Sequence, residues 1–239
     1  MKLDILAIGV HPDDVELSCS GTLLKAIEQG KKVGLLDLTR GELGTRGNAK
    51  IRQEEAAESA KLMGALVREN SKMDDGFFRQ SRKNIMKIVR VIRKYQPEIV
   101  LANALEDRHP DHARASKLTS DACFIAGLAK VESADNEGNM QERWRPKAIY
   151  HYIQDYHLEP DFVIDITPYI DRKMELIMAF KSQFFDPDSK ELDSPISSEN
   201  FMESIKAKNR VFGRPIGVDF AEGFNVERTP GVKSLFDLF

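Results

Sequence analysis

The chain has 239 residues, enough to bury a substantial hydrophobic core in one large domain. Its 35 basic and 38 acidic residues give a formal charge of −3, which favours solubility and gives no support to a nucleic-acid partner. No apolar run approaches the length of a membrane span, and the first residues lack the apolar core of a secretion signal. Cys19 and Cys123 stand far apart in no Cys-x-x-Cys pattern, as expected in a reducing compartment. We therefore expect a cytoplasmic protein with no membrane partner.

Short β-branched runs alternate along the chain with longer helical segments. We predict strands at 4–10, 32–38, 66–69, 98–103, 148–153 and 162–166, and helices at 21–29, 52–63, 82–95, 111–128, 168–180 and 199–212. This alternation is typical of a doubly wound, mostly parallel, Rossmann-like α/β sheet with helices on both faces. We expect a single domain over 1–239, with a core of about 1–130 and a C-terminal elaboration of about 146–239 that ends in an extended arm at 226–232.

The turn after the first strand excludes the dinucleotide site that such a fold first suggests. A dinucleotide needs G-x-G-x-x-G at this point, so that the backbone can approach the pyrophosphate. The chain instead carries two carboxylates, Asp13 and Asp14, which repel phosphate and attract a cation. The glycine-rich segment 40–47 lacks the G-K-[ST] ending of a P-loop.

Two histidine-containing runs follow predicted strands directly: His-Pro-Asp-Asp at 11–14 and Asp-Arg-His-Pro-Asp-His at 107–112. The carboxyl ends of the strands are where open α/β sheets bind ligands. A catalytic zinc typically has three protein ligands and one water. We expect His11 and Asp14 to be ligands, together with one of His109 and His112. Either run alone is ordinary turn composition, but two of them at strand ends favour a metal hydrolase.

A hydrolase also needs a general base and a group that stabilises the oxyanion. Asp13, next to a candidate ligand, is placed to be the base. A protonated His109 would stabilise the oxyanion and protonate the departing amine, with Asp107 or Asp111 orienting its ring. The other two histidines, His151 and His157, are assigned structural roles.

Three arginines lie in or beside the loop after the second strand: Arg40, Arg46 and Arg52. A cation in the first turn of a helix, as predicted for Arg52, opposes the helix dipole and is explained if an anionic substrate binds there. Pairing with nearby glutamates (Glu42, Glu54, Glu55) is the alternative, and it is equally expected for Arg40 and Arg46.

The motifs His-Pro-Asp-Asp-Val-Glu at 11–16 and His-Pro-Asp-His at 109–112 resemble those of the LmbE-type zinc de-N-acetylases, which are related to N-acetylglucosaminyl-phosphatidylinositol deacetylase. Further segments look like those of the bacillithiol biosynthesis deacetylases: 38–47, 74–78, 150–154, 221–224 and 226–233. One departure is that Ser18 and Ser20 flank Cys19, where the family more often has glycines.

The resemblance implies hydrolysis of N-acetylglucosaminyl-malate to glucosaminyl-malate and acetate. It assigns zinc to His11, Asp14 and His112, the general base to Asp13, and the oxyanion and leaving amine to His109. It also implies that Arg52 contacts the substrate and that the chain forms a homo-hexamer. Arg46, Arg40 and Arg108 are the other candidates to bind the malate carboxylates.

Other functions remain open from the sequence. Iron(II) accepts the same ligands as zinc. A related amidase would act on another N-acyl sugar or on a thiol conjugate. Asp13 argues against a binding module without turnover, because binding alone does not need a second carboxylate beside the ligand. A membrane-bound glycolipid deacetylase is disfavoured, since no anchor is present in the sequence.

Overall fold

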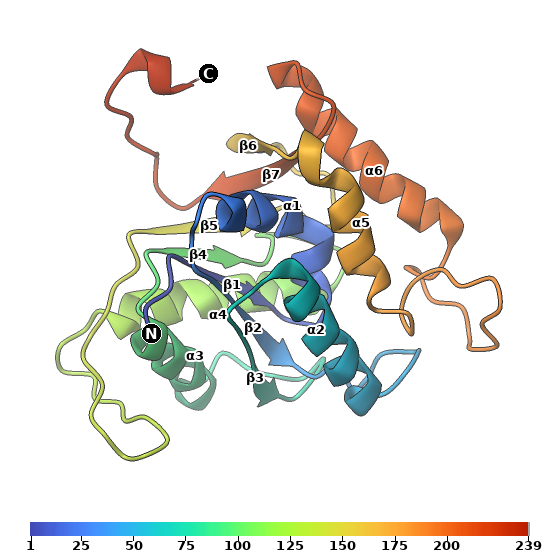
Figure 1. Cartoon of the computed structure of the whole chain (residues 1–239). Helices are drawn as coiled ribbons and strands as arrows, with labels where there is room; N and C mark the ends of the chain where they lie inside the picture. The colour runs from blue at the N-terminus through green and yellow to red at the C-terminus, as the bar shows by residue number, and fades with distance from the viewer. Residues whose placement is uncertain (239) are drawn as a thin grey trace.

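A computed structural model describes residues 1–238 and arranges them around one β-sheet (Figure 1). In this part of the chain the sheet has seven strands in the order β3–β2–β1–β4–β5–β7–β6. The strands are β1 (Ile5–Gly9), β2 (Val33–Thr39), β3 (Val67–Met73), β4 (Ile99–Ala102), β5 (Ala148–Tyr152), β6 (Phe162–Asp165) and β7 (Ala221–Val226). Within residues 1–238, β7 runs in the direction opposite to the other six strands, so the predicted mostly parallel α/β sheet is confirmed.

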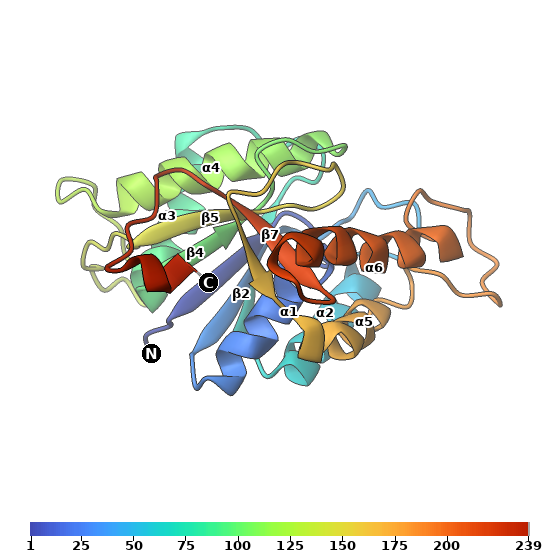
Figure 2. The ribbon, with the colours of Figure 1, turned by 90° about the horizontal axis from the view of Figure 1, so that it is seen from above.

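Helices cover both faces of the sheet. They are α1 (Asp14–Glu28), α2 (Ala49–Met63), α3 (Arg82–Tyr95), α4 (Pro110–Ala126), α5 (Ile170–Met178) and α6 (Glu199–Gly213), with short 3-10 turns at Thr167–Tyr169, Arg214–Ile216 and Leu235–Leu238. Figure 2 shows α3 and α4 on one face and α1, α2 and α5 on the other, while α6 lies beside the β7–β6 end of the sheet. None of the helices in the described residues has the length and apolarity that crossing a membrane requires.

Strand β1 shows why both faces need helices. Its alternate residues Leu6 and Ile8 belong to the hydrophobic core that includes α3 and α4, whereas Ile5 and Ala7 belong to the core that includes α1, α2 and α5. A strand buried on both faces reads as a continuous apolar run, because successive side chains point to opposite sides. The run from Ile5 to Val10 is therefore a buried central strand.

The two histidine-containing turns meet because β1 and β4 are hydrogen-bonded neighbours. After β1 the chain enters α1 on one face, and after β4 it enters α4 on the other (Figure 2). A crevice opens at such a switch point, at the carboxyl ends of the strands. The fold thus brings the turn at 11–14 against the turn at 107–112.

The structure differs from the predicted elements in two places, at the start of one helix and at one strand that was not predicted. Helix α1 begins at Asp14 rather than at residue 21, and its first seven residues are all buried, so they lack the one-sided pattern that identifies a helix. Strand β7 was missed, since only an arm from residue 226 was expected. Its second residue, Glu222, is fully buried, and a charged residue interrupts the apolar run that would mark an internal strand.

Glu222 is tolerated inside the sheet because it forms an ion pair with Lys173 of α5. The Lys173 Nζ lies 2.6 Å from the Glu222 Oε1, and both side chains are fully buried. The amino group also donates to the Leu17 carbonyl oxygen, at 2.9 Å. The carboxylate accepts from the backbone N–H groups of Gly21 and Thr22, at 3.0 and 2.7 Å. This pair joins α5 and β7 to α1, the helix that carries the first histidine motif.

Replacing Lys173 by methionine is expected to lower the free energy of unfolding by about 3–5 kcal/mol, because it leaves the Glu222 carboxylate buried without its cation. Urea unfolding measures this loss. The control is Lys147→Met, which removes an exposed ion pair with Glu98 at 2.8 Å and should change stability by less than about 1 kcal/mol. Equal losses in the two variants would contradict a structural role for the buried pair.

Candidate active site

The structure brings His11, Asp14, His109 and His112 together. Ring nitrogens of the three histidines lie within 4.8 Å of one another. The Asp14 Oδ1 lies 3.7 Å from the His11 Nδ1 and 3.3 Å from the His112 Nε2. In a tetrahedral zinc site with bonds of about 2.0–2.1 Å, neighbouring ligand atoms are about 3.3 Å apart. The side chains that the sequence assigns to a metal therefore have the spacing and chemistry of a metal site.

In both His11 and His112, a carboxylate holds the ring nitrogen that faces away from Asp14. The His11 Nε2 lies 3.1 Å from the Asp75 Oδ1, and the His112 Nδ1 lies 2.6 Å from the Asp107 Oδ2. Carboxylates in this position set the orientation of metal-binding imidazoles and increase their basicity. Asp107 thus orients His112 rather than His109, which corrects one of the two alternatives expected from the sequence.

Asp14 is held by donors from three strand ends. Its Oδ2 accepts hydrogen bonds from the backbone N–H groups of Val10 and His11, at 2.8 and 2.9 Å, and from the Asn103 Nδ2 at 2.9 Å. The Gln154 Nε2 donates to its Oδ1 at 2.8 Å. The carboxylate is buried, and the charges of the two histidines hold its pKa well below the usual range although burial opposes this. Asp14 is an anion in a fixed orientation.

The surroundings of the histidines favour positive charge. Burial alone would lower the pKa of His11, but hydrogen bonds with Asp14 and Asp75 outweigh it and raise the pKa to about 10. The pKa of His112 rises to about 9 against burial, because of Asp14 and Asp107. A site that binds protons this tightly stabilises a cation, and a metal ion that occupies it displaces these protons. This electrostatic pattern also fits a metal site.

Asp13 lies in the same turn but faces Arg52. The Arg52 Nη2 donates to the Asp13 Oδ2 at 2.9 Å and to the Pro12 carbonyl oxygen at 3.2 Å. Burial raises the pKa of Asp13 to about 6, and the arginine charge limits this rise. The contact requires Gly41, because a Cβ at that residue would lie 1.9 Å from the Arg52 Nη1. Asp13 is thus a carboxylate that can gain and lose a proton near neutral pH.

His109 caps the N-terminus of α4. Its Nδ1 accepts a hydrogen bond from the Asp111 backbone N–H at 3.2 Å, so the proton of the neutral ring is on Nε2. Asp111 therefore contacts His109 through its backbone N–H, whereas its carboxylate accepts hydrogen bonds from the Gly76 N–H and the Arg114 Nη1. Burial, together with the charges of His11 and His112, lowers the pKa of His109 below 6.5. These surroundings oppose protonation of the ring, and the role expected for a protonated His109 stays a prediction.

The arginines that the sequence predicts to bind substrate already have partners within the protein. Arg46 is buried and donates to the carbonyl oxygens of Leu192 and Phe184, at 2.7 and 3.3 Å. Arg40 is exposed and lies 3.6 Å from Glu42. Arg108 is partly exposed and ion-paired with Asp155. Arg52, Arg46 and Arg108 all line the cavity of the site, and a role for each in substrate binding stays a prediction.

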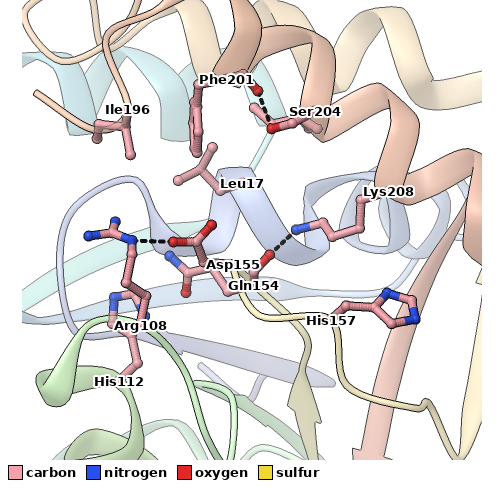
Figure 3. A pocket seen from close by; sticks show the side chains of 11 residues that line it. Leu17, Arg108, His112, Gln154, Asp155, His157, Ile196, Phe201, Ser204 and Lys208 are labelled. Carbon is pink, nitrogen blue, oxygen red and sulfur yellow. Dashed lines mark hydrogen bonds and ion pairs between the residues drawn. The ribbon is translucent and has the colours of Figure 1, made fainter.

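Two adjoining cavities open at the cluster. The main cavity, of about 450 Å³, is lined by the histidine motifs and by the loops 43–46, 75–77 and 194–196. The side cavity, of about 250 Å³, is lined by His112, Gln154, Arg108 and Asp155 on one side and by α6 on the other (Figure 3). His157 lines the side cavity and stacks on Phe212, with ring centroids 5.6 Å apart.

His151 lies outside both cavities. It is fully buried, with its Nδ1 2.9 Å from the Asn103 carbonyl oxygen and its Nε2 3.0 Å from the Glu227 Oε1. These contacts fit the structural assignment made from the sequence.

Sequence reasoning missed Asp75, Asn103 and Gln154 as parts of the site. Each follows a parallel strand within two residues: Asp75 after β3, Asn103 after β4 and Gln154 after β5. The signal was available, because polar residues at the carboxyl ends of parallel strands meet at one edge of the sheet.

Comparisons with known proteins agree with this site. The family described as PIG-L, GlcNAc-PI de-N-acetylase, matches residues 6–123, which include both histidine motifs. Diacetylchitobiose deacetylase of Thermococcus kodakarensis is 30% identical over 95% of this chain and 84% of its own length. The chain belongs to the GlcNAc-PI de-N-acetylase family. The family-level resemblance found in the sequence is thereby confirmed.

Two further relatives show how the family varies. The crystal structure of the conserved protein TT1542 from Thermus thermophilus has a TM-score of 0.85 with 33% identity and covers 98% of both chains. The 4-oxalmesaconate hydratase of Pseudomonas putida is 26% identical over 74% of this chain and 73% of its own length. Relatives of this family member thus include enzymes named for different reactions, and the reaction must be argued from the site.

We expect His112→Ala to lose most of the bound metal, because it removes one neutral ligand from a three-ligand set. His109→Ala is the matched control, since His109 has a ring nitrogen in the same cluster but lies outside the set His11, Asp14 and His112. It should retain near-stoichiometric metal. Metal analysis of the purified variants decides, and retention in His112→Ala with loss in His109→Ala would exchange the two assignments.

Proposed function

We propose that this protein is a zinc-dependent N-deacetylase, and that its substrate is N-acetylglucosaminyl-malate, which it hydrolyses to glucosaminyl-malate and acetate. The observation that carries the proposal is the arrangement around Asp14. A cation-stabilising cluster and a separate carboxylate of intermediate pKa, Asp13, line one cavity. Membership of the GlcNAc-PI de-N-acetylase family supports the reaction class. Iron(II) suits the same donors.

The metal would be held by His11, Asp14 and His112. When bound, it would polarise the acetamide carbonyl and lower the pKa of water toward neutrality. Asp13 would accept a proton from the attacking water, since its pKa of about 6 leaves it mostly ionised at pH 7. Arg52 keeps Asp13 ionised and in place through its hydrogen bond at 2.9 Å.

The neutral ring of His109 donates a hydrogen bond rather than a proton. Its Nε2–H would stabilise the negative charge that develops on the acetamide carbonyl oxygen when water attacks the carbon. The departing glucosamine nitrogen would take the proton that Asp13 received from water. This route is an alternative to the one expected from the sequence, in which a protonated His109 serves the leaving amine, and the lowered pKa of the ring supports it.

The malate part of the proposed substrate rests on the sequence resemblance to bacillithiol biosynthesis deacetylases. The side cavity supports it, because the space beside His112 extends beyond what an acetamide needs. The similarity to 4-oxalmesaconate hydratase suggests a second candidate reaction, the hydration of 4-oxalmesaconate. The assay must include this reaction. Assembly into a homo-hexamer is a further prediction of the resemblance.

The decisive assay is acetate release by zinc-reconstituted protein from N-acetylglucosaminyl-malate and from plain N-acetylglucosamine. We expect turnover of both, with a higher kcat/KM for the malate glycoside. Asp13→Asn should keep its metal and lose activity by a factor of about 100 or more, the usual scale for a lost general base. Hydration of 4-oxalmesaconate without acetate release would overturn the proposal, and so would full activity of Asp13→Asn.

Arg52→Met is expected to move the acidic limb of the pH profile of kcat/KM to higher pH. Asp13 must be ionised to act as base, so activity falls as the pH drops through its pKa. Burial raises this pKa and the Arg52 charge lowers it, so removing the arginine raises it further. Arg40→Met, which removes an exposed arginine paired with Glu42, is the control and should leave the limb in place. An unchanged limb in Arg52→Met would mean that another group titrates there.

A further inference from the structure

One face of α6 forms a wall of the side cavity. The residues of this face are Phe201, Ser204, Ile205 and Lys208, at the spacing i, i+3, i+4 and i+7 (Figure 3). Residues at this spacing share one side of a helix. Leu17 and Ile196 add apolar surface. The cavity is thus mostly apolar, with a single lysine ammonium from α6.

Lys208 is the cation of this cavity that no carboxylate neutralises. Its Nζ donates to the Gln154 carbonyl oxygen, and among the described residues no carboxylate oxygen lies within ion-pair distance of it. Arg108, on the opposite wall, is already paired with Asp155 (Figure 3). Arg46 donates to backbone carbonyls and lies 3.6 Å from Asp193, and Arg52 is paired with Asp13. Among the described lysines and arginines that line the two cavities, Lys208 is the one without a carboxylate within ion-pair distance.

Burial and the charge of Lys173 lower the pKa of Lys208 to about 8, although the charges of Asp107, Asp155 and Glu222 act against this. The side chain therefore remains mostly protonated at neutral pH. A partly desolvated ammonium without a counter-ion gains more from an incoming anion than an exposed one does.

A second unsatisfied group lies beside Lys208. The Oε1 of Gln154 is buried and accepts no hydrogen bond within residues 1–238. The Nε2 of the same side chain donates to Asp14. Gln154 therefore joins the side cavity to the metal cluster, and it leaves one acceptor free for a ligand hydroxyl.

We propose that the side cavity is the aglycone subsite of the enzyme, and that Lys208 binds a carboxylate of that aglycone. The inference rests on the proposed deacetylase function and names the residue that makes it selective. Whole ligands of drug size occupy about 300–1,000 Å³. A side cavity of about 250 Å³ fits a small organic acid attached to the sugar, with the acetamide in the main cavity.

The aglycone anion is assigned as a carboxylate rather than a phosphate. The nearby charges are the Lys208 ammonium, the neutralised Arg108–Asp155 pair and the Asp107 carboxylate. A phosphate monoester would place close to two negative charges on the one group that meets the Lys208 ammonium, whereas each carboxylate of malate places only one there. The apolar side chains of Leu17, Phe201 and Ile205 suit the carbon skeleton of an organic acid.

The test measures binding and turnover with three ligands: N-acetylglucosaminyl-malate, the uncharged methyl N-acetylglucosaminide and N-acetylglucosamine 1-phosphate. Dissociation constants are measured by calorimetry on zinc-loaded protein in the Asp13→Asn background, so that binding is read independently of turnover. Steady-state kinetics use the same substitutions in the active protein. The variants are Lys208→Met, Lys208→Arg and, as control, Lys206→Met on the same helix but outside the side cavity.

Lys208→Met is expected to weaken binding of the malate glycoside about 10- to 100-fold, the scale of one lost charge-assisted hydrogen bond. The loss should appear in KM rather than kcat. Binding of the methyl glycoside should change less than about threefold, Lys208→Arg should restore part of the loss, and Lys206→Met should match the wild type.

Equal losses for the charged and uncharged glycosides in Lys208→Met would overturn the inference, because they would show only a structural role at the Gln154 carbonyl. No loss would also overturn it. Tightest binding of the 1-phosphate, lost in Lys208→Met, would overturn the assignment of the anion as a carboxylate. If acetate release fails but Lys208 still governs binding of the malate glycoside, the proposed reaction is wrong and the subsite stands.

Discussion

The fixed orientation of the Asp14 carboxylate is the constraint on which the site depends. Both of its oxygens accept hydrogen bonds, from the turn after β1, from Asn103 after β4 and from Gln154 after β5. An anion held in this way positions the two imidazoles, His11 and His112, on one side of it. Because its donors come from three neighbouring parallel strands, the geometry of the site follows from the order of the sheet.

Buried charges anchor α1, whose first turn carries this carboxylate. Glu16, one turn of helix from Asp13, accepts hydrogen bonds from the Arg68 Nη1 and the Ser59 Oγ, both at 2.6 Å. Arg68 in turn forms two bonds of 2.8 Å with Asp37 of β2. On another side of α1, Lys173 binds both Glu222 and the Leu17 carbonyl oxygen. Such pairs gain little net stability over apolar contacts, but they fix one arrangement, since leaving any member unpaired is strongly unfavourable. We interpret them as the support that holds Asp13 and Asp14 in place.

The basic residues around the two cavities fall into two groups, those that pair with groups of the protein and one, Lys208, that has no carboxylate partner among the described residues. Arg52 is paired with Asp13 and Arg46 with the loop 184–193, although both also line the main cavity. Lys208 donates to the Gln154 carbonyl oxygen, and the Gln154 side chain donates to Asp14 in the metal cluster. The Lys208 ammonium itself remains available to an anionic ligand. In the function that we propose, an internal arginine controls the catalytic carboxylate, and α6 contributes to substrate choice. Under that proposal, changes at Phe201, Ser204, Ile205 or Lys208 would change selectivity without altering the metal site.

The sequence by itself determined the parts of this protein that depend on local pattern. Apolar runs and helical periods gave the parallel α/β sheet, and the two histidine motifs at strand ends gave His11, Asp14, His109 and His112 as a cluster. It did not reveal β7, because Glu222 interrupts the apolar run and its partner Lys173 lies 49 residues away.

Only the tertiary structure decided which charges remain free. Arg52 looked available for substrate because its partner, Asp13, stands 39 residues earlier and is reached only where Gly41 leaves room. The sequence pattern did not single out Lys208, which reaches the side cavity because α6 packs against β7 and so lies near Gln154. Hydrophobic periodicity specifies each element and its buried face, but the pairing of charges depends on which elements pack together, and that is a property of the whole fold.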